Sequence, residues 1–372
     1  MINIHIYPSN FRNESRIEKQ AQSLSKDIFE HIYLIGMGPD RSEVLSNNVS
    51  LKLFGFSNIP GIKAKLILFS FFYFKVLVFA LKQKEIVVNA HSLSVLPLAY
   101  IIKTIKKSKL IYDTHELETE TQSSSGLRKK VAKYVERILI KNVDHVFVVS
   151  ESIADWYSEN YNIKRPTVVL NAPKYIKVRK NDLFRKKFKI ENNQLIVLYQ
   201  GILADGRGID ILLEAFKNCL DDRIVVVFMG YGDLAHSIQS DAVTYKNIFF
   251  HNAVPPEDVL NYTASADIGV SFIQNTCLSY YYCMPNKLFE YTMAGLPVIV
   301  SDMLDMRKFV ESHNIGVVVE DNSLESFINS LATILKMDSK ILKDNAKEAS
   351  LKYCWEHQEK KMLTVYKSML NK

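Results

Sequence analysis

The sequence predicts an α/β protein built from two doubly wound parallel-sheet domains that face each other across a cleft. Its 372 residues are more than one ordinary hydrophobic core accommodates, so two domains are expected. Hydrophobic residues make up 48% and charged residues 23% of the chain, which excludes a disordered or fibrous protein. Short β-rich apolar runs alternate with longer helical patterns, as in parallel sheets covered by helices on both faces. This alternation occurs twice along the chain.

The first domain is expected to span residues 1–171. Helical patterns cover Ser15–Glu30 and Leu127–Lys141, between runs of strand-forming residues. The expected strands are Ile2–Tyr7, His31–Gly36, Ile86–Ala90, Leu110–Asp113, His145–Val149 and Val168–Leu170.

The second domain is expected over residues 195–352, after a linker. Residues 172–194 are basic and polar, which predicts a linker with a short helix. Residues 353–372 predict a C-terminal helix that packs back on the N-terminal domain. The expected strands are Leu195–Gln200, Ile224–Met229, Asn247–Phe250, Ile268–Phe272, Val298–Ser301 and Gly316–Val319.

Two apolar segments bear on localisation. Met1–Tyr7 alternates apolar and polar residues, which suits a buried strand better than a secretion signal, so a cytoplasmic protein is expected. Leu66–Leu81 is the most membrane-like segment, but it carries Lys75 in its middle. As a helix it would be about 24 Å long, against about 30 Å of hydrocarbon. We expect it not to cross a bilayer.

The net charge of +7 belongs to the first half of the chain. Residues 1–171 hold 23 of the 47 Lys and Arg but 16 of the 40 Asp and Glu, a difference of +7. The basic clusters within Lys103–Lys109 and Arg128–Lys141 suit anionic lipid headgroups at the inner face of the cytoplasmic membrane or an anionic acceptor, and equally a solvated basic surface. Nucleic acid is not expected as a partner, because no nucleic-acid-binding motif accompanies these charges.

Cysteine and carboxylate spacings predict no metal and no cofactor. The four cysteines form no CxxC pair and have no regular spacing with histidine, so neither a disulfide framework nor a structural zinc site is indicated. No DxD or similar carboxylate pair follows a strand where a divalent ion would bridge phosphates.

The loop that follows the strand Leu195–Gln200 has the residues of a phosphate site. Because ligands bind beyond the carboxyl ends of strands in open parallel sheets, such loops are the first candidates for function. Gly201 and Gly208 let the backbone approach an anion, and Arg207 supplies a fixed cationic fork before a helix N-terminus. A tight turn with a solvated arginine is the alternative.

A second glycine loop, Gly230–Ala235, formally matches the GxGxxA dinucleotide fingerprint. That fingerprint expects a carboxylate at the end of the next strand to hold a ribose, and His251 and Asn252 stand there instead. We therefore interpret Gly230 and Gly232 as positions that pack closely against a nucleotide base or phosphate, or as a purely structural turn.

The stretch Pro285–Asp302 is the most informative. A short helix is expected to begin at Pro285 and to carry Lys287 and Glu290 three residues apart, on one face. A lysine suits a phosphate, and a carboxylate can accept hydrogen bonds from both hydroxyls of a ribose. Asn286 and Leu288 adjoin them as further donor-binding candidates. A surface ion pair worth about 0.2–0.5 kcal/mol is the alternative.

These segments resemble the donor-binding region of retaining glycosyltransferases of family 4, of the bacterial cell-surface polysaccharide type, which have the GT-B fold. The resemblance rests first on the Pro-Asn-Lys-Leu-Phe-Glu-Tyr run at 285–291 and on Ala294–Asp302, and it extends along most of the chain. The other matching segments are Tyr112–Glu116, Val149–Ser150, Asn171–Pro173, Tyr199–Gly201, Arg207–Gly208, Gly230–Gly232, Val254–Asp258 and Ala266–Asp267.

The resemblance implies a role for each candidate residue. Glu290 would bind the donor ribose and Arg207 the diphosphate, and His115 would lie near the reacting centre, so that His115, Arg207 and Lys287 are the catalytic candidates. Many members carry an arginine where this chain has Ile202, which places diphosphate binding on Arg207 and Lys287. Acceptor-side candidates are Ser15 and Arg16 at an expected helix start, with solvated capping as the alternative, and Glu116.

The implied reaction is metal-independent, hexosyltransferase-type transfer from a UDP- or GDP-sugar to a hydroxyl of a saccharide or lipid-linked saccharide acceptor, with retained anomeric configuration. Fixed cations around the departing diphosphate stabilise the transition state, and in the family's usual mechanism that phosphate takes the acceptor's proton. A sugar-nucleotide epimerase of the same fold and a non-catalytic sugar-nucleotide binder remain alternatives. An NAD-dependent oxidoreductase is disfavoured by the missing ribose carboxylate.

Overall fold

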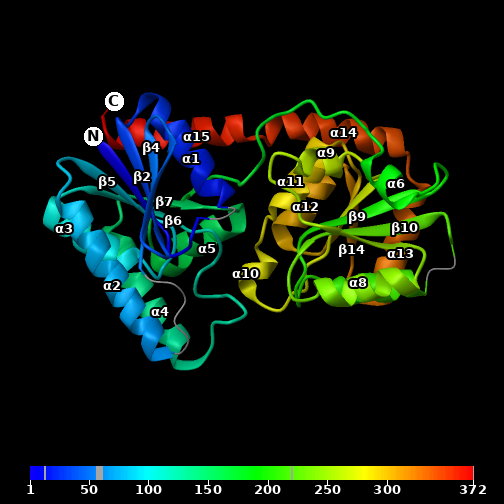
Figure 1. The fold of residues 1–372 in the computed structure, drawn as a ribbon, viewed down its shortest axis with the longest axis horizontal. Helices are drawn as coiled ribbons and strands as arrows, with labels where there is room; N and C mark the ends of the chain where they lie inside the picture. Colours follow the sequence, from blue (N-terminus) through cyan, green and yellow to red (C-terminus); the bar gives the residue numbers. More distant parts are fainter. Residues whose placement is uncertain (12–13, 56–61, 219–220, 372) are drawn as a thin grey trace. The chain divides into compact units, whose positions relative to one another are not determined.

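The chain forms two compact α/β units, each with its own sheet. The computed structural model describes residues 1–11, 14–55, 62–218 and 221–371 (Figure 1). Contacts divide the chain into one unit of Met1–Val169 with Glu359–Lys372 and another of Leu170–Gln358. The predicted class, two parallel-sheet α/β domains, is confirmed.

The first unit contains an eight-stranded sheet in the order β3-β4-β2-β1-β5-β6-β7-β8. Neighbouring strands are parallel except for the antiparallel pair of β3 and β4. All six predicted strands are present, with ends that differ by no more than two residues from those expected. The strands are β1 (Ile2–Ile6), β2 (His31–Met37), β3 (Arg41–Ser46), β4 (Val49–Phe54), β5 (Ile86–Ala90), β6 (Lys109–Asp113), β7 (His145–Val148) and β8 (Thr167–Val168).

The hairpin of β3 and β4 was not predicted. Most side chains of β3 are exposed, so this edge strand lacks the apolar run by which the others were recognised. In β4, Val49, Leu51 and Leu53 are buried in alternation, which is the period of a half-buried strand. The sequence therefore contained a signal for β4 but none for β3.

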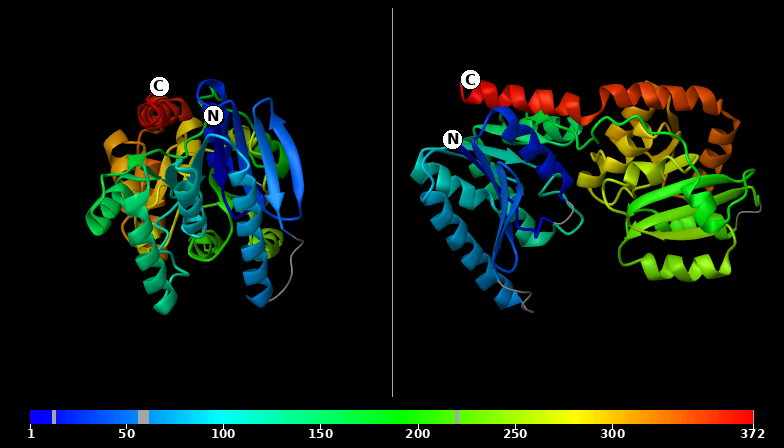
Figure 2. Two further views of the ribbon diagram at one scale, coloured as in Figure 1. Left: turned by 90° about the vertical axis from the view of Figure 1, so that its left-hand side faces the viewer. Right: turned by 45° about the horizontal axis from the view of Figure 1, so that its top comes forward.

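The helices of the first unit cover its sheet. Ser150 caps α5 by accepting a hydrogen bond from the N–H of Ile153 at 3.3 Å. Helix α3 packs against both α2 and α4 (Figures 1 and 2). None of the helices in the described part of the chain combines the length and the apolar run needed to cross a bilayer. The helices are α1 (Ser15–Asp27), α2 (Ile62–Leu81), α3 (Leu96–Lys106), α4 (Gly126–Leu139), the 3-10 turn η1 (Ile140–Asn142), α5 (Glu151–Tyr161) and most of α15 (Trp355–Met369).

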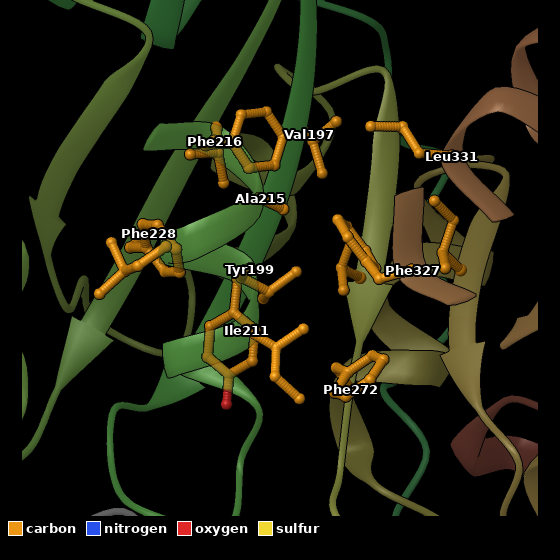
Figure 3. Close-up of a cluster of buried hydrophobic side chains, with 14 of the residues drawn as sticks. Val197, Tyr199, Ile211, Ala215, Phe216, Phe228, Phe272, Phe327 and Leu331 are labelled. Atoms are coloured by element: carbon orange, nitrogen blue, oxygen red, sulfur yellow. The ribbon is translucent and has the colours of Figure 1, made fainter. Parts of the chain in front are cut away.

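The second unit contains a six-stranded, wholly parallel sheet in the order β11-β10-β9-β12-β13-β14. Its core joins Val197 and Tyr199 of β9 to Phe216, Phe272 and Phe327 (Figure 3). All six predicted strands are again present. They are β9 (Leu195–Ile202), β10 (Ile224–Tyr231), β11 (Ile248–Asn252), β12 (Ile268–Ser271), β13 (Val298–Ser301) and β14 (Gly316–Val319).

Helices surround the second sheet, and one of them, α6, lies inside the expected linker. An ion pair between Arg185 of α6 and Asp267, at 2.7 Å, attaches this helix to the second unit. The helical pattern at the end of the chain is broken at Tyr353 and Cys354 into α14 and α15. The helices are α6 (Leu183–Phe188), α7 (Ile209–Lys217), α8 (Ala235–Thr244), α9 (Val259–Thr263), α10 (Leu278–Tyr281), α11 (Asn286–Met293), α12 (Leu304–His313), α13 (Leu324–Lys336) and α14 (Ser339–Lys352).

Candidate active site

In the second unit, the loop between β9 and α7 is shaped by its glycines. Gly201 and Gly208 have φ angles of +114° and +64°, in the region that favours glycine. A Cβ on Gly208 would lie 2.1 Å from the ring of Phe272, which is part of the core in Figure 3. Gly208 therefore closes the loop onto the core, and Arg207 precedes it directly.

Helix α11 is fixed to the sheet by Tyr291. The hydroxyl of this buried residue accepts the N–H of Gln200 and lies 3.1 Å from the carbonyl oxygens of Leu198 and Val270. This contact joins the middle of α11 to the carboxyl end of β9. Lys287 and Glu290, on the same helix, are thereby brought beside the glycine loop.

Lys287 and Arg207 form a cationic pair at this loop. The Nζ of Lys287 lies 3.7 Å from the ring centre of Tyr199, and the guanidinium carbon of Arg207 lies 4.8 Å from that of Tyr280. In the part of the chain that the structure describes, neither forms an ion pair with a carboxylate, whereas Arg185 of the same unit does. Burial, and then the charge of Arg207, lower the pKa of Lys287 to about 7. Two neighbouring cations, of which only Lys287 interacts with the charge of a carboxylate, that of Glu290, create a place for an anion.

Glu290 is held by a side-chain relay. Its Oε2 accepts a hydrogen bond from Nε2 of Gln200 at 2.5 Å, and Oε1 of Gln200 accepts one from Thr263 at 2.8 Å. Gln200 and Thr263 are both buried, which fixes the amide and hence the carboxylate. Sequence reasoning missed these two residues, because Thr263 lies 63 positions after Gln200 and no local motif contains both.

The structure gives three predicted donor-binding residues an internal role. A Cβ on Gly230 would lie 1.8 Å from the carbonyl oxygen of Gly201, and one on Gly232 would lie 2.3 Å from that of Leu203. At both glycines, therefore, the chain approaches itself too closely for a side chain. Leu288 is fully buried, and its N–H donates to the carbonyl of Pro285. Asn286, at the start of α11, is exposed.

In the first unit, His115 follows β6 and belongs to a polar cluster. Its Nε2 lies 3.2 Å from Nδ1 of His91 and 3.8 Å from Oδ2 of Asp113. Its ring is 20% exposed and lies 5.2 Å from that of Tyr7. Burial lowers the pKa of His115 to about 3, so the imidazole is neutral. His91 was not among the candidates, although it directly follows a strand.

Arg16 was predicted to be an acceptor-side residue, but its charge does not face solvent where an acceptor could bind. It is 4% exposed, and its guanidinium donates to both carboxylate oxygens of Asp113, at 2.6 to 3.2 Å. Burial alone would raise the pKa of Asp113, but Arg16 with His91 and His115 holds it well below its usual range. Arg16 is thus a buried structural partner. Ser15 begins α1 and is half-buried, and Glu116 is exposed.

Among the residues that the structure describes, one set of side chains has metal-ligand chemistry. The donor atoms of His91, Asp113 and His115 all lie within 4.8 Å of one another. Asp113 is already bonded to Arg16 and accepts a further hydrogen bond from Gln20 at 2.7 Å. A divalent cation at this trio would meet the Arg16 charge, so hydrogen bonding explains the cluster better.

Two family models together match most of the chain. Residues 17–172 match Glycosyltransferase Family 4, and residues 180–352 match Glycosyl transferases group 1. His115 lies in the first match, and Arg207, Lys287 and Glu290 lie in the second. The chain is a glycosyltransferase with the GT-B fold.

Two curated relatives are similar to this glycosyltransferase. It is 24% identical over 298 residues to the putative glycosyltransferase YtcC of Bacillus subtilis, which covers 72% of this chain and 69% of the relative. It is 26% identical over 176 residues to the UDP-Gal:alpha-D-GlcNAc-diphosphoundecaprenol alpha-1,3-galactosyltransferase of Escherichia coli, which covers 44% of this chain and 42% of the relative.

Solved structures share the fold at low sequence identity. Sucrose-phosphate synthase from Thermosynechococcus elongatus has a TM-score of 0.82 and 15% identity, covering 100% of this chain and 99% of that one. Alr3699/HepE of Anabaena, solved with UDP-glucose, has a TM-score of 0.74 and 13% identity, covering 99% and 100%. These similarities show that the glycosyltransferase has the GT-B fold.

Proposed function

We propose that the enzyme transfers a sugar from a UDP- or GDP-sugar to a hydroxyl of a saccharide or lipid-linked saccharide, with retained configuration and without a metal ion. The pair of Arg207 and Lys287 carries this proposal. Among the described residues neither cation forms an ion pair, and Lys287 shares α11 with the fixed carboxylate of Glu290, an arrangement that matches a pyrophosphate joined to a ribose.

The chemistry follows from where charge develops. The bond between the anomeric carbon and the diphosphate oxygen breaks, and its electron pair stays on the diphosphate. Arg207 and Lys287 stabilise that growing negative charge, which lowers the barrier. The acceptor oxygen forms the new bond on the same face, and its proton passes to the departing phosphate. No protein side chain acts as the general base in this scheme.

The names of similar proteins agree with this donor and acceptor class. The Escherichia coli relative uses UDP-galactose and a diphosphoundecaprenol-linked sugar, and the Anabaena structure holds UDP-glucose. We infer by this similarity a role in bacterial surface glycan synthesis, with the acceptor carried on a lipid.

A thermal-shift screen tests the donor site. The protein is heated with UDP, GDP, ADP or CMP in the presence of a chelator, and one diphosphate is expected to stabilise it. A ligand at about 100 times its Kd adds about 2.7 kcal/mol to the free energy of unfolding. Glu290→Ala should abolish the shift and Arg207→Ala should weaken it. Arg223→Ala is the control, because this exposed arginine is paired with Asp221.

Unchanged melting curves with all four nucleotides would contradict the proposal. A shift that needs a divalent ion would contradict metal independence. The nucleotide sugars of the responding base are then incubated with the enzyme and lipid-linked or free saccharides. A glycosylated product with the donor's anomeric configuration is expected, whereas an epimerised nucleotide sugar formed without acceptor would indicate an epimerase.

We also propose that the first unit contacts the inner face of the cytoplasmic membrane through α2, α3 and α4. Apolar side chains are exposed along these packed helices: Leu66, Ile67 and Phe74 on α2, Ile101 and Ile105 on α3, and Leu127, Val131 and Tyr134 on α4. Lysines and arginines interrupt them on α3 and α4. Apolar side chains among cations suit an anionic bilayer surface.

Vesicle sedimentation tests this surface. Binding is expected to vesicles with anionic phosphatidylglycerol and to be weaker with phosphatidylcholine alone. Leu127→Ser combined with Tyr134→Ser should reduce it, since these side chains are 77% and 67% exposed. Val243→Ser is the matched control, because Val243 is 90% exposed but belongs to the second unit. Equal binding by all variants would exclude this surface.

A further inference from the structure

Two tyrosine rings contact the cations of the candidate donor site. Nζ of Lys287 lies 3.7 Å from the ring centre of Tyr199, and the guanidinium carbon of Arg207 lies 4.8 Å from that of Tyr280. Both distances are below about 6 Å, the limit of a cation–π contact, in which the electron-rich face of a ring attracts a positive charge. The proposed transfer reaction gives neither tyrosine a part, although both touch the groups on which donor binding depends.

Arg207 is held differently from other arginines of the second unit. Arg185, Arg223 and Arg307 each form an ion pair with an aspartate. An aspartate holds a guanidinium in place but also cancels its charge. A tyrosine ring holds it while the positive charge remains, because the neutral ring attracts the cation only through its quadrupole. Arg207 is therefore restrained and still able to attract an anion.

The two cations repel each other, so other contacts must keep them together. Burial, and then the charge of Arg207, lower the pKa of Lys287, which shows that the two charges interact. Lys287 also interacts with the charge of Glu290. Long cationic side chains without fixed contacts would spread into solvent, and a bound diphosphate would have to gather them against their conformational entropy. Rings that hold the cations in the free protein reduce that entropic penalty.

Tyr199 is a rigid support for Lys287. Its side chain is completely buried in the core of the second unit (Figure 3), and its hydroxyl donates to the carbonyl oxygen of Ile202 at 3.0 Å. Burial raises the pKa of this phenol, so the ring stays neutral. A Cβ on Gly201 would lie 3.7 Å from Cε of Lys287. The end of the lysine side chain therefore lies against both the ring and the glycine loop.

Tyr280 belongs to a segment that is bonded to the loop of Arg207. It is half-buried and lies on α10, which follows β12. Between these two elements, the N–H of Gln274 donates to the carbonyl oxygen of Gly206 at 2.9 Å. Gly206 directly precedes Arg207. The ring and the guanidinium are therefore carried by two stretches of backbone that are joined to each other.

We propose that Tyr199 and Tyr280 are positioning residues that hold Lys287 and Arg207 by their ring faces, so that both cations are in place and still charged when the diphosphate binds. This inference rests on the proposed transferase function and deepens it at the donor site. The same contacts keep the cations beside the departing diphosphate while its negative charge grows. The rings act through the cations and form no bond to the donor.

Fluorinated phenylalanines at position 280 test the electrostatic role of the ring. Each added fluorine weakens the attraction between the ring face and a cation, while the shape of the ring changes little. In calorimetric titrations with UDP or GDP, whichever nucleotide stabilises the protein, Tyr280→Phe should bind within about twofold of wild type. The Kd should then rise stepwise through the mono-, di- and trifluorinated rings, and Tyr280→Leu should lose about three- to tenfold in affinity. A constant Kd through the series would overturn the proposal.

The same series at position 199, referred to Tyr199→Phe, tests the contact with Lys287. Tyr245→Leu is the control, because the ring of Tyr245 lies 5.7 Å from Nζ of Lys217, a lysine that forms an ion pair with Asp241. Removing this ring should leave nucleotide affinity unchanged.

Tyr280→Glu separates holding the guanidinium from keeping its charge. The new carboxylate would restrain Arg207 but cancel its charge, so the Kd should be higher than that of Tyr280→Leu. Wild-type affinity in Tyr280→Glu would overturn the proposal, because a free positive charge would then not be required.

Nuclear magnetic resonance of the free protein distinguishes this inference from the proposed function. With 13C-labelled lysine and arginine, the ε-methylene protons of Lys287 and the δ-methylene protons of Arg207 should be shifted upfield by the ring currents. Lys287→Arg and Arg207→Lys assign the signals, and Tyr280→Leu should return that of Arg207 to its ordinary position. Ordinary shifts in a protein that binds the nucleotide would overturn this inference alone. Upfield shifts in a protein that no nucleoside diphosphate stabilises would confirm the ring contacts and contradict the proposed function instead.

Discussion

The lowered pKa of Lys287 predicts that affinity for the donor falls as the pH rises above 7. In the free protein this pKa is about 7, because of burial and the nearby charge of Arg207. A bound pyrophosphate gives the ammonium a partner, so the pKa in the complex is higher. A group whose pKa rises on binding contributes fully below its free pKa and loses that contribution above it. The effect therefore lies on the alkaline side of neutrality.

The magnitude follows from the protonated fraction of free Lys287. That fraction falls from about 90% at pH 6 to about 10% at pH 8, so Kd should rise about tenfold, or about 1.4 kcal/mol. Binding should also take up about half a proton at pH 7 and nearly one at pH 8. Part of the binding free energy is thus used to protonate Lys287 when the pH is above its free pKa.

Isothermal titration calorimetry at constant ionic strength, in buffers of different ionisation enthalpy, measures both quantities. The titrant is UDP-glucose or GDP-mannose, whichever matches the base found in the thermal-shift screen, because a sugar pyrophosphate does not itself titrate in this range. Lys287→Arg retains its charge and should bind with a nearly flat pH profile. Lys287→Met should bind weakly at every pH. Wild-type affinity that is flat or improves from pH 6 to pH 8 would refute the reasoning.

Two further predictions concern stability. Gly230→Ala should lower the free energy of unfolding by about 1–3 kcal/mol or more in denaturant melts, because the new Cβ would lie 1.8 Å from a carbonyl oxygen. Gly38→Ala is the control and should have little effect, because the nearest atom to its Cβ would be 3.4 Å away. Equal losses in the two variants would argue against the close packing at Gly230. Arg16→Leu should cost about 3–5 kcal/mol at pH 7 by leaving buried Asp113 unpaired, with Arg223→Leu as the exposed control. That loss should shrink as the pH falls, because the unpaired carboxyl has a raised pKa and becomes neutral; a loss independent of pH would point to packing alone.

Most of the fold could be predicted because its strands are apolar runs that a local pattern reveals. The predicted and observed bounds of Val298–Ser301 and Gly316–Val319 are identical, since each is a continuous run of strand-forming residues in a parallel sheet. The exposed edge strand β3 has no such run. The placement of a half-exposed strand depends on the neighbour with which it pairs, and that neighbour is not visible in a short stretch of sequence.

In the candidate site too, local sequence patterns revealed some residues and not others. Arg207 stands in the loop that follows β9, and Lys287 and Glu290 lie three residues apart on α11, so residue type and spacing were enough to mark them as candidates. The residues that hold Glu290 in place could not be selected in this way, because Gln200 of β9 and Thr263 of α9 are brought together only by the fold. Long-range contacts of this kind require the strand and helix arrangement to be known.

The buried polar residues of β1 and β5 show what an additional step could have recovered. Asn3 and His5 occupy alternate positions of an otherwise apolar strand, which marks one face of β1 as polar. Asn89 and His91 repeat the pattern at β5. Strands β1 and β5 are neighbours, with Asn3 opposite Val87 and His5 opposite Asn89. Two buried strands with the same polar alternation predict that they pair, although their order in the sheet has to be assumed.

The division of the first unit into two chain segments affects how the protein is made. Tyr366 is buried in the first unit, where it hydrogen-bonds with Asn89 and packs against Phe29 and Phe147. The ribosome synthesises all of Leu170–Gln358 before it reaches this residue. Until the second unit has been translated, the apolar surface of the first unit that Tyr366 covers stays exposed. We expect chaperones and proteases to act on the first unit mainly during this interval.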